Sequence, residues 1–421
     1  MKRKLIKQIR HEWRTNLWMS IELLIVSVIV WFITDYLFVI AQTVNEPKGY
    51  DIDNTFLLEF GTLPEHSPRY VAVENGEEQD NLDRMAIYEV IKNNPDVESV
   101  SMSSCMEPGL MNWMGTTVLI NDDDSASISV RAGEITPSHI KTIGIKAKDP
   151  KISQDDLIKM LEDGKALISD FVADNKKLSH PMNPESLVGA NIGNYGENKE
   201  VGAVIEYLKR VDTEIYKRDI ILVTGMSESN PETYGGWKYL SVRVKPSATK
   251  DFISNFNKDR DRLYSRNNTF ISSIKSYQDQ IEETNRDMNV TKRKYIGCMV
   301  FMLVSIFLGL LGTFWFRTRQ RVPEIAIRKV NGASNQSIVL RLASEAIFLL
   351  TLVTPLAAVG DWLICHYELN MNIRNEFFVP SRLVITIAIT YGIILLTILA
   401  GIAYPAWRAV KVQPAEALKD E

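Results

Sequence analysis

Four long apolar segments interrupt an otherwise mixed sequence of 421 residues. Each is about 20 residues long with few charges, which is the length a helix needs to cross a hydrocarbon core roughly 30 Å thick. The segments are Leu17–Ile40, Ile296–Phe316, Ile347–Cys365 and Leu383–Tyr404. Residues 42–294, between the first and second segments, are polar and long enough for one or two compact domains.

The polar region alternates between strand-like and helix-like patterns. Strands are predicted at Thr55–Leu63, Val97–Met102, Thr116–Ile120, Ala126–Arg131, Lys165–Ser169, Lys199–Tyr207, Ile220–Thr224 and Tyr239–Val244. Helices are predicted at Leu82–Asn93, Asp155–Glu162, Asp170–Lys177 and Ala248–Leu263. The fold class is therefore an α-helical membrane protein with four transmembrane helices and a large mixed α/β extracytoplasmic domain inserted between the first and second helices.

The stretch from Ser272 to Tyr295 contains neither proline nor glycine, and its apolar residues recur at helical spacing. We expect one helix that continues into the second apolar segment. At 1.5 Å per residue this part would reach roughly 35 Å beyond the membrane. We favour a stalk that carries force over a helix that is merely solvated.

Basic residues mark three places in the chain as cytosolic. They are Lys2, Arg3, Lys4, Lys7, Arg10 and Arg14 before the first segment, Arg317, Arg319, Arg321, Arg328 and Lys329 after the second, and Arg408 and Lys411 after the last. The positive-inside rule then places both termini in the cytosol and the polar region outside. The first segment lacks a small-residue cleavage pattern, so we interpret it as an uncleaved anchor.

Acidic residues within the apolar segments have two interpretations. Glu22 and Glu345 fall near the predicted inner ends, and Asp35 and Asp361 near the outer ends. Charges near the ends of a span are less costly than charges at its centre. We therefore favour solvation or packing hydrogen bonds over a proton path.

The polar region offers little catalytic chemistry. The run Ser101–Met114 is rich in methionine and includes Cys105, so either packing or a Cu(I) site is open, and we favour packing. His66, His139 and His180 are far apart in sequence and do not form a recognisable catalytic or metal motif. The sequence contains no GxxxxGK[ST] phosphate loop. We predict a protein that is not an enzyme, without a bound cofactor or metal.

The segment Arg317–Glu345 lies between the second and third apolar segments. Val322–Pro323 begins a predicted helix, Gly332 ends it, and Ala333–Asn335 caps the next helix. An amphipathic helix lying on the inner leaflet is one interpretation of this segment.

Two motifs in this half of the chain resemble those of the MacB/FtsX-like permease superfamily. The run PEIAIRKVNGASNQSIVLRLASEAI is similar to its cytosolic signature, in which an E-I-[GA]-I-R-K helix and G-A-[ST] precede the third membrane helix. Ala403–Leu418 resembles the family's terminal pattern. In the outer domain Gly189, Val201–Glu206 and Leu240–Pro246 resemble the MacB-like periplasmic core domain. The chain differs from MacB in having no fused ATPase domain, and Asn331 stands where alanine or a leucine-type residue is usual.

The resemblance implies the permease subunit of a type VII, or mechanotransmission, ABC transporter in the bacterial inner membrane. A separate cytosolic ATPase would bind ATP and Mg²⁺, and the permease would pair as a homodimer or heterodimer. The coupling residues implied by position are Glu324, Ile325, Ile327, Arg328, Lys329 and Gly332. Arg328 and Lys329 would face acidic patches of the ATPase, and Ile325 or Ile327 would pack in its groove.

The resemblance also suggests the organisation of the chain and two possible functions. The expected parts are residues 1–16 as a basic cytosolic segment, 17–41, 296–316, 341–365 and 383–404 as transmembrane helices, 42–271 as the outer domain, 272–295 as the stalk, 317–340 as the coupling segment, 366–382 as an outer loop and 405–421 as the cytosolic tail. We favour efflux of a peptide, lipid-linked or small toxic compound, with a periplasmic adaptor and outer-membrane channel as possible partners. The alternative is an FtsX-like regulator of a cell-wall hydrolase or sensor partner that transports nothing.

Overall fold

The computed structural model describes residues 13–110, 114–170, 183–194, 197–212, 220–236, 239–320, 322–367, 369–370 and 380–411. The chain divides into two compact units. Thr43–Asp287 forms the α/β unit, and Met1–Gln42 together with Met288–Glu421 forms the helical unit. The predicted helix Asp170–Lys177 falls outside the described residues after Asp170.

Eleven strands of the α/β unit form one hydrogen-bonded sheet in the order β10-β11-β1-β9-β2-β4-β3-β6-β7-β5-β8. They are β1 (Thr55–Thr62), β2 (Val97–Ser104), β3 (Met114–Ile120), β4 (Asp123–Ile135), β5 (Ala166–Ser169), β6 (Asn191–Asn194), β7 (Glu197–Ile205), β8 (Ile220–Gly225), β9 (Tyr239–Val244), β10 (Ser265–Arg266) and β11 (Thr269–Ser276). β8 also pairs in parallel with β4. The second half of the sheet therefore closes on itself as a six-stranded barrel, while the first half stays open.

Side chains of the barrel alternate between two cores because successive residues of a strand face opposite sides. On β8, Ile220 and Leu222 belong to the apolar cluster inside the barrel, whereas Ile221 and Val223 belong to a cluster outside it. The outer cluster is covered by α4 (His139–Thr142) and α5 (Gln154–Glu162).

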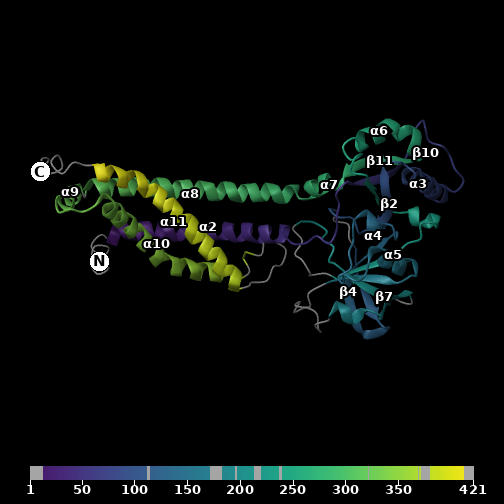
Figure 1. Ribbon diagram of the computed structural model, residues 1–421, viewed down its shortest axis with the longest axis horizontal. Helices are drawn as coiled ribbons and strands as arrows, with labels where there is room; N and C mark the ends of the chain where they lie inside the picture. The colour runs from purple at the N-terminus through teal and green to yellow at the C-terminus, as the bar shows by residue number, and fades with distance from the viewer. Residues whose placement is uncertain are drawn as a thin grey trace. The chain divides into compact units, whose positions relative to one another are not determined.

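The open half of the sheet has its own core. Helices α3 (Gly76–Lys92) and α6 (Phe252–Leu263) supply Tyr88, Phe252 and Phe256 to a cluster formed with β1, β2, β9 and β11. Figure 1 shows both helices beside β11 and β2. The strands and helices predicted in the described part of this region are present, with shifted ends.

The predicted helix Ser272–Tyr295 is wrong in its first residues. Residues 269–276 form β11, which pairs antiparallel with β1, so Phe56 lies opposite Ser276. The helix α7 (Tyr277–Thr284) starts only after Ser276, whose side chain accepts a hydrogen bond from the Asp279 amide at 3.0 Å. Asn285 then separates α7 from α8 (Arg286–Gln320), so the expected single helix is two helices.

The remaining helices belong to the helical unit, apart from the end of α2. They are α2 (Trp13–Val44), α9 (Val322–Val330), α10 (Asn335–His366) and α11 (Pro380–Lys411). Among the described residues, four helical segments are long and apolar enough to cross a membrane: Met19–Val44, Arg286–Gln320, Asn335–His366 and Pro380–Arg408. One apolar cluster joins α2, α8, α9, α10 and α11, and α10 and α11 lie side by side (Figure 1).

A buried ion pair connects α2 to α11. Arg382 donates from Nε to Asp35 Oδ1 at 2.7 Å and from Nη2 to Oδ2 at 2.5 Å. Asn370 donates to the same carboxylate at 2.9 Å. The side chains of Asp35 and Arg382 are only 2% and 12% exposed. Asp35 therefore has the packing hydrogen bonds that the sequence left as one of two interpretations.

Polar side chains fill one face of β2 and β9 in the α/β unit. Ser101 and Ser241 lie opposite each other on these strands, and both are fully buried. Ser101 contacts His139 Nδ1 at 2.8 Å, and Ser241 contacts the Tyr277 hydroxyl at 2.6 Å. On the same face, Ser103 donates to the buried carboxyl of Glu107.

Two of these buried groups respond to pH in opposite directions. Burial raises the pKa of Glu107 from 4.5 to about 7, so the folded protein keeps a proton that the unfolded chain loses. Its contribution to stability therefore falls as the pH rises from about 4.5 to 7. Burial lowers the pKa of His139 from 6.5 to about 3, so its contribution falls as the pH drops through that range. The two effects oppose each other between about pH 4.5 and 6.5.

We predict that Glu107→Gln removes the loss of stability that Glu107 causes as the pH rises. Relative to the wild type, the free energy of unfolding of the variant should rise by about 1.4 kcal/mol per pH unit between pH about 4.5 and 7. Urea unfolding of the full chain in detergent, followed at a series of pH values, measures the difference. The exposed Glu65 gives the control Glu65→Gln, which should run parallel to the wild type. A Glu107→Gln curve that also runs parallel would contradict the prediction.

We predict that Asp35→Asn destabilises the chain by about 3–5 kcal/mol, because it leaves the buried guanidinium of Arg382 without its counter-charge. Replacing both members by apolar residues, Asp35→Leu with Arg382→Met, should recover most of the loss. Thermal unfolding in detergent compares the variants. The exposed pair Asp259–Arg262 gives the control Asp259→Asn, which should change stability by less than about 1 kcal/mol. Equal effects of Asp35→Asn and Asp259→Asn would show that the Asp35 pair is not desolvated as described.

Candidate functional site

The short helix α9 connects the two long helices α8 and α10. It starts at Val322 and ends at Val330, and Gly332 follows with a φ of +84°, which favours glycine. Ser334 caps α10, its side chain accepting from the Ser337 amide at 3.3 Å. The predicted start, end and cap of these helices are confirmed. Figure 1 shows α9 where α8 ends and α10 begins.

Glu324 attaches α9 to α10. Its Oε1 accepts from Arg328 Nη2 at 2.9 Å, one turn along the same helix, and from Arg341 Nη2 at 3.3 Å, on α10. The predicted coupling residue Arg328 thus already has an acidic partner within its own helix. Arg341 was not among the predicted residues, because nothing in its local sequence distinguishes it from other basic residues.

The two predicted isoleucines lie in different environments. Ile325 is 6% exposed and belongs to the apolar cluster of the helical unit, next to the buried Ala326. Ile327 is 52% exposed, and Val330, one turn further, is 65% exposed. Of the two residues expected to pack in a partner's groove, only Ile327 is available at the surface. Lys329 is half-buried.

A small hollow lies between α9 and the first turns of α10. It has a volume of about 40 Å³ and is lined by Glu324, Ile325, Arg328, Ala333, Ser337, Ile338 and Arg341. Its walls combine an apolar floor with two guanidinium groups. Glu324 already accepts hydrogen bonds from both guanidinium groups, so the hollow is part of the contact between α9 and α10.

Aromatic and basic side chains gather at the adjoining ends of α8 and α11. Trp315 stacks on Tyr404 with ring centroids 5.5 Å apart, and the Arg408 guanidinium lies 4.4 Å from the Trp315 ring centre. Lys411 lies 3.8 Å from the centre of the Trp407 ring. Tryptophan, tyrosine and basic residues together are typical of the headgroup level of a bilayer. Of these residues, Arg408 and Lys411 served in the sequence to assign the cytosolic side, and the aromatic residues did not.

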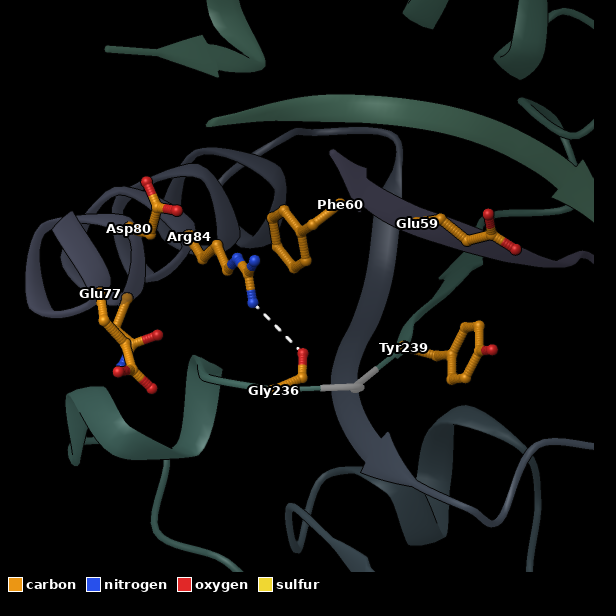
Figure 2. Close-up of a pocket in the computed structure, with 8 residues that line it drawn as sticks. Glu59, Phe60, Glu77, Asp80, Arg84, Gly236 and Tyr239 are labelled. Atoms are coloured by element: carbon orange, nitrogen blue, oxygen red, sulfur yellow. Dashed lines mark hydrogen bonds between the residues drawn. The ribbon is translucent and has the colours of Figure 1, made fainter. Parts of the chain in front are cut away.

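The α/β unit contains a second candidate region, an open pocket of about 690 Å³ (Figure 2). Glu59, Glu77 and Asp80 line it together with Phe60 and Tyr239. Three carboxylates and two aromatic rings suit a cationic or amphipathic ligand, and the volume is typical of ligand pockets. Sequence reasoning missed this pocket because its residues come from β1, α3 and the start of β9.

Arg84 forms one wall of this pocket. Its Nη1 donates to the carbonyls of Tyr234 at 3.1 Å and Gly236 at 3.3 Å, and its guanidinium lies 5.7 Å from the centre of the Phe60 ring. Burial lowers the pKa of Arg84, although the charge of Asp80 opposes this. Arg84 therefore fixes α3 against residues 234–236.

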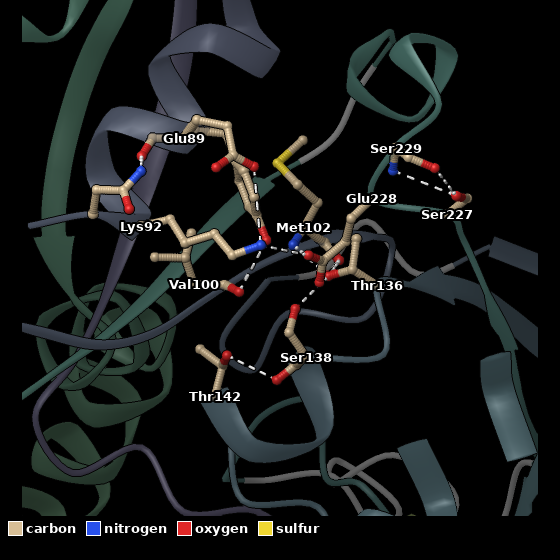
Figure 3. Close-up of polar contacts among 12 residues, drawn as sticks. Glu89, Lys92, Val100, Met102, Thr136, Ser138, Thr142, Ser227, Glu228 and Ser229 are labelled. Carbon is tan, nitrogen blue, oxygen red and sulfur yellow. Dashed lines mark hydrogen bonds and ion pairs between the residues drawn. The ribbon is translucent and has the colours of Figure 1, made fainter. Parts of the chain in front are cut away.

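Polar contacts hold the other end of α3 (Figure 3). Lys92 pairs with Glu228 at 3.0 Å, and the Tyr88 hydroxyl donates to the Val100 carbonyl at 3.2 Å. The Thr136 hydroxyl accepts a hydrogen bond at 2.9 Å from the amide of Met102, which lies on the same strand as Val100, β2. Contacts in the middle of α3, at Arg84, and at its end, at Lys92, therefore attach this wall of the pocket.

The other residues singled out from the sequence do not form a chemical site as far as the structure describes them. His66 is exposed, His139 is buried against Ser101, and His180 lies outside the described residues. Met102 and Met106 belong to two different apolar clusters, and Met111 is not described. No group of three or more His, Cys, Asp or Glu side chains that could hold a metal occurs in the part of the chain that the structure describes.

Glu22 and Glu345 are placed against other parts of the helical unit. A Cβ added to Gly309 of α8 would lie 2.8 Å from Glu22 Oε1, so the glycine makes room for this carboxyl group. Glu345 lies on α10, is buried, and makes a polar or electrostatic contact with another part of the chain. Both residues thus pack inside the helical unit.

Comparison with known families places the second half of the chain. A search of curated protein sequences gives no match. Residues 296–414 match the FtsX-like permease C-terminal domain, a stretch that contains α9, α10 and α11 together with most of α8. Residues 296–414 are therefore similar to the C-terminal domain of FtsX-like permeases, a match that supports a permease-type membrane protein.

Proposed function

We propose that this chain is the transmembrane subunit of an ABC transporter and couples ATP hydrolysis by a separate cytosolic ATPase to movements of its α/β unit. The observation that carries the proposal is the two-sided nature of α9. One face is anchored through Ile325 and Glu324, and the other exposes Ile327 and Val330. A docking helix needs both a free apolar face and a firm attachment.

The attachment of α9 determines which other helices would move if a force acted on it. Ile325 shares a buried cluster with Leu310 of α8 and Ile338 of α10. Glu324 adds the contact to Arg341 of α10. Because packed interiors transmit displacement with little compression, movement of α9 would shift the ends of both helices.

The connections of the α/β unit to the membrane helices support the same proposal. Asp212 pairs with Lys48 at 2.6 Å, near the end of α2, and accepts from Asn285 at 3.0 Å, just before α8. Lys209 is fully buried and binds the Thr43 carbonyl. Both chain connections of the unit are therefore bound to the segment 209–212.

Helix α7 adds a further attachment within the α/β unit. Its Thr284 hydroxyl donates to the Gly109 carbonyl at 2.5 Å, and Tyr277 contacts Ser241. Gly109 has a φ of +82°, and a Cβ there would approach Ile281 to 2.8 Å. The helix α8 that follows is 35 residues long, about 50 Å at 1.5 Å per residue. Force along α8 would therefore be passed into the sheet.

The pocket of Figure 2 favours transport over regulation. Its volume suits a ligand the size of a drug or short peptide segment, and its carboxylates suit a positive charge. We propose efflux of a peptide, lipid-linked or small toxic compound, with ATP and Mg²⁺ bound by the ATPase. Pairing of two permease chains in the bacterial inner membrane, and assembly with a periplasmic adaptor and outer-membrane channel, belong to the same proposal. An FtsX-like regulator without transport is the second candidate.

We predict that Ile327→Asp and Val330→Asp each uncouple the ATPase. In nanodiscs with the partner ATPase, permease-dependent ATP hydrolysis should fall roughly tenfold or more, as expected when a charge enters an apolar contact. The exposed Val71 of the α/β unit gives the control Val71→Asp, which should keep full activity. All three variants should unfold within about 0.5 kcal/mol of the wild type, because the side chains are exposed.

Variants of the anchored face of α9 also test whether α9 is the coupling helix. Glu324→Lys, or deletion of Ile325–Lys329, should uncouple hydrolysis while leaving the α/β unit folded, since neither change touches that unit. Normal coupling in these variants, or in both aspartate variants, would exclude α9 as the coupling helix.

A further inference from the structure

Asp361 is a buried acidic residue of the helical unit that the proposed function does not use. It lies on α10 and is 2% exposed, and its Oδ1 has no hydrogen-bond partner in the described part of the chain. Among the buried hydroxyl groups that also lack a partner, two lie near Asp361: Ser27 Oγ on α2 and Thr390 Oγ1 on α11. Buried polar atoms normally have a partner, so three unpartnered oxygens require an explanation.

The three oxygens belong to residues that line one cavity. Its volume is about 20 Å³, and it is also lined by Thr354 and Tyr391. A space of this size holds a single water-sized particle. The other two polar residues are already engaged: Thr354 donates to the Leu350 carbonyl at 2.7 Å, and the Tyr391 hydroxyl contacts Thr351 at 3.1 Å. The unpartnered atoms thus come from three different helices and share one small space.

The charge of Asp361 also lacks compensation. Arg382 donates two hydrogen bonds to Asp35 and neutralises it. Among the residues that the structure describes, no ion pair joins a basic side chain to Asp361. An ionised carboxylate buried alone costs several kcal/mol. One positive charge in the cavity would remove this cost.

We propose that the cavity binds a single sodium ion through Asp361, Ser27 and Thr390. The donor atoms are all oxygens, which hard cations prefer. A carboxylate with two hydroxyl groups supplies one negative charge, which a monovalent ion balances and a divalent ion would exceed. A proton on Asp361 would neutralise the carboxylate but would not by itself supply partners for both hydroxyl groups. The ion would join α2, α10 and α11 at one point.

Thermal unfolding of the full chain in detergent, without ATPase or substrate, tests the proposal. Replacing choline chloride by sodium chloride at constant ionic strength should raise the melting temperature by on the order of 2–4 °C, increasing with the logarithm of the sodium concentration. Potassium chloride should give a smaller rise in melting temperature, because the larger ion keeps its charge farther from the carboxylate and binds it less strongly. The result is independent of the proposed function, because no coupling is measured.

Variants assign the effect to the cavity. Asp361→Asn should abolish the sodium-dependent rise, and Ser27→Ala or Thr390→Val should require roughly tenfold more sodium for the same rise. Thr397→Val on α11 is the matched control. Its hydroxyl group donates to the Ile393 carbonyl at 3.0 Å, and it does not line the cavity, so its response should equal that of the wild type. The serine and threonine variants keep the test valid if Asp361→Asn does not fold.

Three results would overturn the proposal. The first is the same melting temperature in sodium and choline chloride for the wild type. The second is a sodium-dependent rise that survives in Asp361→Asn, which would place the ion elsewhere. The third is a wild type that responds to pH but not to sodium, with Asp361→Asn equally stable, which would identify Asp361 as a protonated acid.

Discussion

Helices in a hydrocarbon environment must satisfy their polar groups with protein atoms, since no water is available there. Several polar groups of the helical unit follow this constraint. Hydroxyl groups of Thr313 and Thr397 donate to carbonyls one turn earlier in their own helices. The carboxylate of Asp35 takes three hydrogen bonds from Arg382 and Asn370. These contacts fix α2 against α11, and they make the cavity beside Asp361 an exception that needs its own explanation.

The α/β unit differs from the helical unit because its buried polar face carries titratable groups that are kept neutral by burial, whereas Asp35 is ion-paired. Glu107 and His139 are both buried and are both kept neutral by burial over the range in which free side chains would be charged. Glu107 is two residues from Gly109, whose carbonyl group accepts from α7. The acidic group and the attachment of α7 thus lie on the same short loop. A change that destabilises this loop should therefore also weaken the attachment of α7.

Local signals in the sequence were sufficient for α9 and its surroundings. Pro323, Gly332 and Ser334 act within a few residues of themselves, so the start and end of the helices follow from the sequence. Strand β11 was misassigned because its partner β1 is more than 200 residues away, and pairing at that distance leaves no local periodicity. The same reason applies to the barrel closed by β4 and β8, and to the pair of Asp35 with Arg382.

Candidate residues were predictable in position but not in role. Ile325 and Ile327 are equivalent in a one-dimensional pattern, and only the packing of α9 shows that the first is buried. Arg341 and Asp361 belong to the same helix, α10, one facing Glu324 and the other the small cavity. Pro355 lies between them and lacks the amide hydrogen that would bond one turn back, which weakens the helix there. The two ends of α10 therefore have separate polar contacts, with the weakened part of the helix between them.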